Sequence, residues 1–130
     1  MKRLKNFGIG VDIESIERFG RLGVIDNKLF LNKIFTKKEL NYCFSKKKPA
    51  PYLAARYAGK EAIFKALSSI GESNLSYKFL EIFNNKNGVP EVKINKTGFN
   101  ELYVRLSLSH CGDKAIAFAA VMELESHEQD

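Results

Sequence analysis

A long helix is predicted between Tyr52 and Leu67, and this segment constrains the fold more than any other. Alanine, leucine, lysine, glutamate and arginine make up most of it, and all five are strong helix formers. Pro49 and Pro51 precede it, where proline suits a helix start, and Gly71 follows it, where glycine commonly ends a helix. On a helical wheel the large apolar side chains share one side and alanines cover most of the other, so we expect a buried helix.

Four charged residues interrupt this apolar helix: Arg56, Lys60, Glu61 and Lys65. Buried charge is costly unless it is paired or bound to a ligand. In one interpretation, Glu61 and Lys65 form an ordinary i,i+4 pair, and Arg56 and Lys60 extend to water. In the other, Glu61 holds a metal ion and the three cations face phosphate groups. The helix alone leaves both open.

The composition describes a folded chain with an excess of positive charge. With 130 residues, 45% of them hydrophobic, the chain has the length and apolar content of one folded domain. The formal net charge of +6 makes a polyanionic partner plausible, whether nucleic acid, a phosphorylated cofactor or an acidic protein. Cys43 and Cys111 lack the spacing of a zinc site or a disulfide framework, which favours free thiols in a reducing cytosol. Neither a signal peptide nor a membrane span is predicted.

A strand is predicted near the N-terminus, from Phe7 to Ile13. Its large apolar side chains alternate with Gly8, Gly10 and Asp12. One face of the strand is therefore apolar, while the other is nearly bare and ends in a carboxylate. Another group can approach such a bare face closely.

The segments that follow this strand have helical spacing. Short helices are expected over residues 14–19, 26–34 and 36–44, and the last of these begins with a capping-box pattern. Arg18 and Arg21 stand at the exposed end of the first.

Beyond the long helix the pattern changes to strands, expected over residues 79–83, 91–94, 103–110 and 114–124. Asn87-Gly88 marks a hairpin between the first two. This order predicts an α+β fold in which an antiparallel sheet packs against a long central helix and shorter helices. We expect one domain over residues 1–130, with residues 125–130 as a frayed tail.

Few residues remain as candidates for chemistry: Asp12, Glu61, Lys65 and His110. Two carboxylates together with phosphate oxygens and water form a common site for Mg²⁺. The ion and Lys65 would neutralise charge on a transferred phosphoryl group. The alternatives are structural: Asp12 caps the following turn, and His110 is a histidine at a sheet edge.

Three motifs carry a resemblance to a known family. Gly8–Ile13 (Gly-Ile-Gly-Val-Asp-Ile) with Arg18, then Ala58–Ala66 (Ala-Gly-Lys-Glu-Ala-Ile-Phe-Lys-Ala), resembles the two-part signature of 4′-phosphopantetheinyl transferases, and Leu106–His110 resembles a third motif. The similarity is greatest to the small holo-acyl-carrier-protein synthase group. The two main motifs together are highly specific, whereas either alone is not.

The resemblance implies an enzyme that acts in fatty acid biosynthesis, within lipid metabolism, in the cytoplasm. Such a transferase moves the 4′-phosphopantetheine group of coenzyme A to a serine of an apo acyl carrier protein and releases adenosine 3′,5′-bisphosphate. The reaction depends on Mg²⁺, for which Mn²⁺ can substitute. Family members of this size are homotrimers with active sites between subunits, so His110 or Arg18 could serve a neighbour's site.

The resemblance also implies roles for individual residues. Asp12 and Glu61 would coordinate Mg²⁺, and Lys65 would contact the pyrophosphate and stabilise the leaving phosphate. Glu61 is the expected base for the serine hydroxyl, directly or through a water molecule on the metal.

The remaining roles concern the two substrates. Arg56, Lys60 and His110 match positions near the nucleotide and its 3′-phosphate and, with Lys65, form the expected coenzyme A site. Arg18 and Arg21 are expected to meet the acidic carrier protein.

Two departures from the family pattern and two alternative functions remain. Gly59 replaces a usual alanine, which costs about 1 kcal/mol of helix stability or admits a closer ligand. The hairpin at Asn87–Pro90 carries one inserted residue.

A basic nucleic-acid-binding module would use Lys46–Lys48, but no aromatic pattern interleaves the basic residues, so no nucleic acid is expected. A non-catalytic relative is disfavoured by the presence of Asp12, Glu61, Lys65 and His110.

Overall fold

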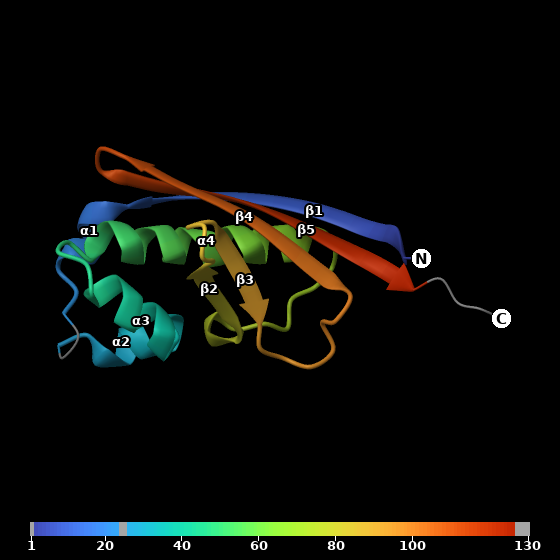
Figure 1. Ribbon diagram of the computed structural model, residues 1–130, viewed down its shortest axis with the longest axis horizontal. Helices are drawn as coiled ribbons and strands as arrows, with labels where there is room; N and C mark the ends of the chain where they lie inside the picture. The colour runs from blue at the N-terminus through green and yellow to red at the C-terminus, as the bar shows by residue number, and fades with distance from the viewer. Residues whose placement is uncertain (1, 24–25, 127–130) are drawn as a thin grey trace.

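The computed structural model describes residues 2–23 and 26–126, and a central helix, α4 (Ala50–Ser69), runs along most of the molecule (Figure 1). Pro51 lies in its first turn, and Gly71, just past its end, has φ +85°. This confirms the predicted long helix, which is slightly longer at each end. Within these ranges no helix is long and apolar enough to span a membrane.

A three-stranded antiparallel sheet covers one side of α4, as Figure 1 shows. It consists of β1 (Lys2–Ser15), β5 (Lys114–Ser126) and β4 (Leu102–Cys111), in the order β1-β5-β4. The long apolar strand at the C-terminus is thus central, with Asp12 of β1 opposite Ala117 and Leu106 of β4 opposite Ala119. The α+β class predicted from the sequence is confirmed.

The bare face of β1 lies directly against α4. Gly8 and Gly10 are buried there, and a Cβ at Gly10 would overlap the carbonyl oxygen of Ala62 and lie 2.9 Å from the Cβ of Lys65. The group that approaches this strand closely is therefore the α4 backbone. Because the glycine face of β1 points inward, its apolar face points outward.

Three short helices pack around the N-terminal half of α4: α1 (Ile16–Gly20), α2 (Lys28–Ile34) and α3 (Lys37–Phe44). Phe19, Leu31 and Phe35 form the buried contact, together with Leu53 of α4. Thr36 caps α3 as predicted: its hydroxyl accepts from the Glu39 amide, and the Glu39 carboxylate accepts from the Thr36 amide.

A second, two-stranded sheet lies on the other side of α4 (Figure 1). A short 3₁₀ helix, η1 (Tyr77–Phe79), leads into β2 (Leu80–Asn84), which pairs with β3 (Pro90–Ile94). Gly88 turns the predicted hairpin with φ +81°.

Gly59 lies where this hairpin and β4 meet α4. A Cβ there would lie 2.8 Å from Ile82 Cδ1 and 3.3 Å from the Cδ2 atoms of Leu106 and Leu108. Core side chains therefore fill the space beside Gly59, and the suggestion that it admits a closer ligand is wrong.

The C-terminal strand extends further than the sequence indicated. Ser126 pairs with Lys2, and Glu125 pairs with Arg3, whose guanidinium also contacts the Glu125 carboxylate at 3.0 Å. The frayed tail predicted from residue 125 is therefore wrong for these two residues, and the rest of it, residues 127–130, lies outside the described residues.

Candidate active site

Asp12 and Lys65 meet where β1 crosses α4. Lys65 Nζ donates to Asp12 Oδ1 at 3.1 Å and to the carbonyl oxygen of Val11 at 3.0 Å. The second oxygen of Asp12, Oδ2, is buried and accepts no hydrogen bond from any described residue. An orphaned buried carboxylate oxygen is costly and points to a ligand.

Glu61 lies one turn before Lys65 on α4 and is partly buried. The hydroxyl of Tyr77 donates to Glu61 Oε2, and no donor to Oε1 is found in the described part of the chain. Burial and this hydrogen bond raise the pKa of the Tyr77 phenol above its ordinary value, so the phenol remains a donor. The i,i+4 pair of Glu61 with Lys65, one of the two interpretations of the charged residues of this helix, is not formed, because Lys65 pairs with Asp12.

Glu14 is a third carboxylate at this site, and the sequence reasoning missed it. Burial, the adjacent Asp12 carboxylate and the negative charge of Glu61 raise the pKa of Glu14 to about 7, while Arg18 at 3.1 Å opposes the shift. The pKa of Glu14 thus responds to both proposed metal ligands. The alternation of side chains along a strand places residues 12 and 14 on one face, and this was the available signal.

The carboxylates fit a magnesium ion that is shared with a phosphorylated substrate. Among residues 2–23 and 26–126, no three His, Cys, Asp or Glu side chains form a ready metal cluster. Mg²⁺, however, is commonly held by one or two carboxylates plus substrate phosphates and water. Among the described residues, Asp12 Oδ2 and Glu61 Oε1 are left without a donor on the two residues that match the family's metal ligands, so the donor set suits the ion.

Arg56 is a buried cation that forms no ion pair with a carboxylate in the part of the chain that the structure describes. It is only 3% exposed, its guanidinium lies 4.2 Å from the centroid of the Tyr42 ring, and its Nε has no hydrogen-bond acceptor among the described residues. Arg56 lines a cavity of about 180 Å³ together with Tyr52, Ser109 and His110. An unpaired buried guanidinium is costly unless an anion reaches it, which indicates an anion site in this cavity.

His110 lies near the end of β4, exposed, between this cavity and a larger one of about 610 Å³. Lys47 and Lys48 line the larger cavity. The structure therefore brings His110, Arg56, Lys47 and Lys48 to one region.

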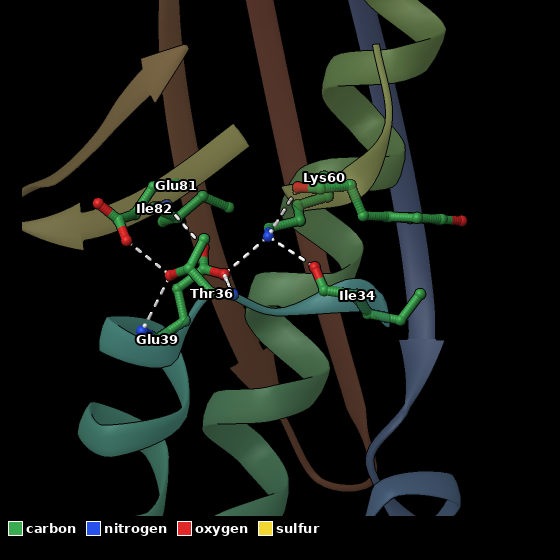
Figure 2. Close-up of polar contacts among 7 residues, drawn as sticks. Ile34, Thr36, Glu39, Lys60, Glu81 and Ile82 are labelled. Atoms are coloured by element: carbon green, nitrogen blue, oxygen red, sulfur yellow. Dashed lines mark hydrogen bonds and ion pairs between the residues drawn. The ribbon is translucent and has the colours of Figure 1, made fainter. Parts of the chain in front are cut away.

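Lys60 belongs neither to the carboxylate site around Asp12 nor to the cavity that Arg56 and His110 line. Its ammonium is fully buried and donates to Ile34 O at 2.8 Å, Glu39 Oε1 at 2.7 Å and Tyr77 O at 3.0 Å (Figure 2). Burial lowers the pKa of Lys60, and the Glu39 carboxylate opposes that shift. All three ammonium protons have protein acceptors, so the geometry contradicts the expected contact of Lys60 with coenzyme A and the earlier view that it extends to water.

Figure 2 also shows that Glu39, the carboxylate partner of Lys60, is itself fixed by a further hydrogen bond. Glu39 Oε2 accepts from the amide of Ile82 at 2.7 Å, and the hydroxyl of Thr36 donates to Glu81 Oε2 at 2.6 Å. This buried network joins α3, α4 and β2.

Arg18 and Arg21 lie on the surface, at the end of β1 that carries Asp12. The Arg18 guanidinium contacts Glu14 and lies 5.3 Å from the centroid of the Tyr57 ring. Arg21 follows α1 directly and is exposed. Both are accessible, and Arg18 borders the carboxylates.

Comparison with known proteins supports the family resemblance that the sequence motifs carry. Residues 8–119 match the 4′-phosphopantetheinyl transferase superfamily. The holo-[acyl-carrier-protein] synthases of Thermodesulfovibrio yellowstonii and Protochlamydia amoebophila are 44% and 41% identical to the chain. These matches cover 88% and 86% of this chain and 96% and 94% of the relatives.

Solved structures give the same result. The holo-[acyl-carrier-protein] synthase of Helicobacter pylori, in complex with coenzyme A, matches with a TM-score of 0.73 and 30% identity over 87% of this chain and 98% of that one. The synthase of Neisseria meningitidis matches with a TM-score of 0.73 and 34% identity over 89% and 97%. The chain therefore belongs to the 4′-phosphopantetheinyl transferase superfamily and, within it, to the holo-[acyl-carrier-protein] synthase enzymes.

Proposed function

We propose that this protein transfers 4′-phosphopantetheine from coenzyme A to a serine of an apo acyl carrier protein, with Mg²⁺, and releases adenosine 3′,5′-bisphosphate. The observation that carries the metal assignment is the unpaired, buried Oδ2 of Asp12 beside Lys65, with Glu61 on the neighbouring turn. When bound, Mg²⁺ would polarise the pyrophosphate and neutralise its charge.

Lys65 is suited to hold the reacting phosphate. Two of its three ammonium protons go to Asp12 and Val11, so one remains for a pyrophosphate oxygen, and the side chain is 55% exposed. The serine oxygen would attack the phosphorus attached to the pantetheine arm while the bond to the bridging oxygen breaks. Lys65 then stabilises charge on the departing phosphate, and Glu61 is the proposed acceptor of the serine proton.

The nucleotide end of coenzyme A is assigned to the cavity lined by Arg56 and His110. The unpaired guanidinium of Arg56 supports a phosphate there, and the 3′-phosphate is the proposed occupant. Lys60 is left out of this set because its protons are taken.

The carrier protein is assigned to the surface near Arg18 and Arg21. Positive side chains beside the carboxylate site, on a chain of net charge +6, suit an acidic partner and would steer its approach. The reaction is assigned to fatty acid biosynthesis in the cytoplasm.

A homotrimer is part of the proposal. The outward side of the three-stranded sheet, called here the outer sheet face, exposes the large apolar residues Leu4, Phe7, Ile9, Val11, Ile13, Ile116 and Phe118, each at least 41% exposed. A contiguous exposed apolar patch of this kind marks an interaction surface. Lys65 shares a cavity of about 410 Å³ with Ile9, Val11 and Phe118 of this face, so a second copy seated there would border the active site.

Intact-mass measurement tests the transfer. With Mg²⁺ and coenzyme A, an apo carrier should gain one phosphopantetheine, and Glu61→Gln should lose metal-dependent turnover while remaining folded. No gain across a panel of apo carriers from fatty-acid and polyketide synthesis would contradict the proposal. An unchanged rate for Glu61→Gln would remove Glu61 from the site.

A further inference from the structure

The ring of Tyr77 lies over the turn of α4 that carries Glu61. It stacks on Tyr57, with ring centroids 5.9 Å apart and an interplanar angle of 18°, and meets Phe64 edge-on at 5.0 Å and 73°. Tyr57 precedes Glu61 by four residues and Phe64 follows it by three, so these neighbours bracket Glu61 along the helix. Aromatic contacts of this geometry restrict the ring on both sides.

The backbone of Tyr77 is fixed as well. Its carbonyl oxygen accepts from the fully buried ammonium of Lys60 at 3.0 Å, and that ammonium is held in place by Ile34 and Glu39. Lys60 and Glu61 are adjacent in α4, so the same turn binds the backbone and the hydroxyl of Tyr77. A hydroxyl on such an anchored ring has little freedom to leave its acceptor.

Each proposed metal ligand has one oxygen engaged by this chain. Tyr77 engages Oε2 of Glu61, and Lys65 engages Oδ1 of Asp12. The other oxygens, Glu61 Oε1 and Asp12 Oδ2, have no donor in the described part of the protein. Mg²⁺ requires nearly ideal octahedral geometry from single oxygens, whereas Ca²⁺ accepts bidentate carboxylates and irregular geometry.

We propose that Tyr77 is a positioning residue for Glu61: its hydroxyl occupies Oε2, so that Glu61 presents only Oε1 to the metal and the site favours Mg²⁺ over Ca²⁺. This inference rests on the proposed function. Hydrogen bonds that orient a metal ligand affect metal affinity by about 10–100-fold when removed. Without the hydroxyl, the Glu61 carboxylate can rotate and offer both oxygens, which suits the larger ion.

The test is the substitution Tyr77→Phe, which keeps the ring and the backbone carbonyl that Lys60 binds. Metal affinity is measured at saturating coenzyme A by electron paramagnetic resonance of Mn²⁺, with Mg²⁺ and Ca²⁺ as competitors. We expect affinity for Mn²⁺ and Mg²⁺ to fall about tenfold or more and affinity for Ca²⁺ to fall less. Tyr103→Phe is the matched control: it removes a hydroxyl that accepts from Lys2 at the opposite end of β1 from Asp12, and metal affinity should stay unchanged.

A double-mutant cycle separates positioning from general packing. In the Glu61→Gln background, Tyr77→Phe should change Mn²⁺ affinity by less than about twofold, because the group that it positions has been altered already. Additive losses would overturn the inference, and so would an unchanged preference between Mg²⁺ and Ca²⁺ in Tyr77→Phe. If the unmodified protein itself binds no Mn²⁺ through Asp12 and Glu61, the proposed function fails instead.

Discussion

Two lysines of one helix, five positions apart, have opposite surroundings. Lys60 is fully buried and donates to three protein acceptors, whereas the Lys65 side chain is 55% exposed and retains a free proton. A buried charge left without its partner destabilises a protein far more than the loss of an exposed pair does. Lys60 is therefore assigned to stability and Lys65 to chemistry.

Replacing each lysine by methionine tests this division. Lys60→Met should lower the free energy of unfolding by about 3–5 kcal/mol, because Glu39 remains buried without its cation. Lys65→Met should lower it by on the order of 1 kcal/mol but remove most of the turnover. Urea denaturation and initial transfer rates supply the two readouts, and equal stability losses would contradict the assignment.

Glu14 gives the metal-free protein a pH-dependent stability. Its pKa rises from 4.5 in the reference state to about 7 in the folded protein, so between these values the folded state binds more protons than the unfolded state. Its stabilising contribution is complete below pH 4.5 and is lost as the pH rises through about 7. We expect the unfolding free energy to fall by up to about 3 kcal/mol across that window.

Denaturation without metal at several pH values measures this slope, and Glu14→Gln, which cannot ionise, should flatten it. If the slope were the same in both proteins, another group would be responsible.

At the scale of elements, local patterns predicted most of the fold, because helix ends, hairpins and alternation depend on neighbouring residues. The proline-flanked helix, the Thr36 cap and the Asn87-Gly88 hairpin all formed as expected. The partners of the charges on α4 could not be predicted in this way. Lys60 meets Glu39, a residue of another helix, and no periodic signal links the two.

In the candidate site, too, local motifs indicated some residues, whereas contacts between distant segments were not predicted. The motifs indicated Asp12, Glu61 and Lys65, and the structure brings Lys65 to Asp12. Tyr77 follows a loop without hydrophobic periodicity, so nothing in its local pattern indicated that its hydroxyl reaches Glu61. Such contacts depend on how β1, α4 and η1 pack together, which a single sequence does not display.

The contact of β1 with α4 makes a prediction for two glycines. Gly10→Ala would drive a methyl group into the Ala62 carbonyl, which belongs to rigid helix backbone. Gly59→Ala meets only the ends of three flexible apolar side chains, and it gains about 1 kcal/mol of helix propensity. Gly10→Ala should therefore lower the melting temperature strongly, while Gly59→Ala should change it little, as thermal denaturation followed by circular dichroism can show. Similar effects of both would mean that β1 does not lie as close to α4 as this geometry requires.

At the scale of the whole molecule, the outer sheet face is the feature that a monomer does not explain. Phe118 stands on the central strand, 45% exposed, and shares the cavity that Lys65 lines. A charge at this position would cost little in a monomer but would be buried without a partner in a trimer. We therefore expect Phe118→Asp to convert a trimer into monomers in sedimentation analysis and to reduce transfer activity in parallel.

The matched control is Leu29→Asp, which places the same charge on α2, away from this sheet, at a residue that is 90% exposed. That variant should sediment and react like the unmodified protein. Phe118→Asp should also show a concentration-dependent rate, because dilution separates weakened subunits and with them any site that two subunits share. A monomeric unmodified protein with full activity at all concentrations would exclude both the trimer and the shared site, and the apolar face would then need another partner.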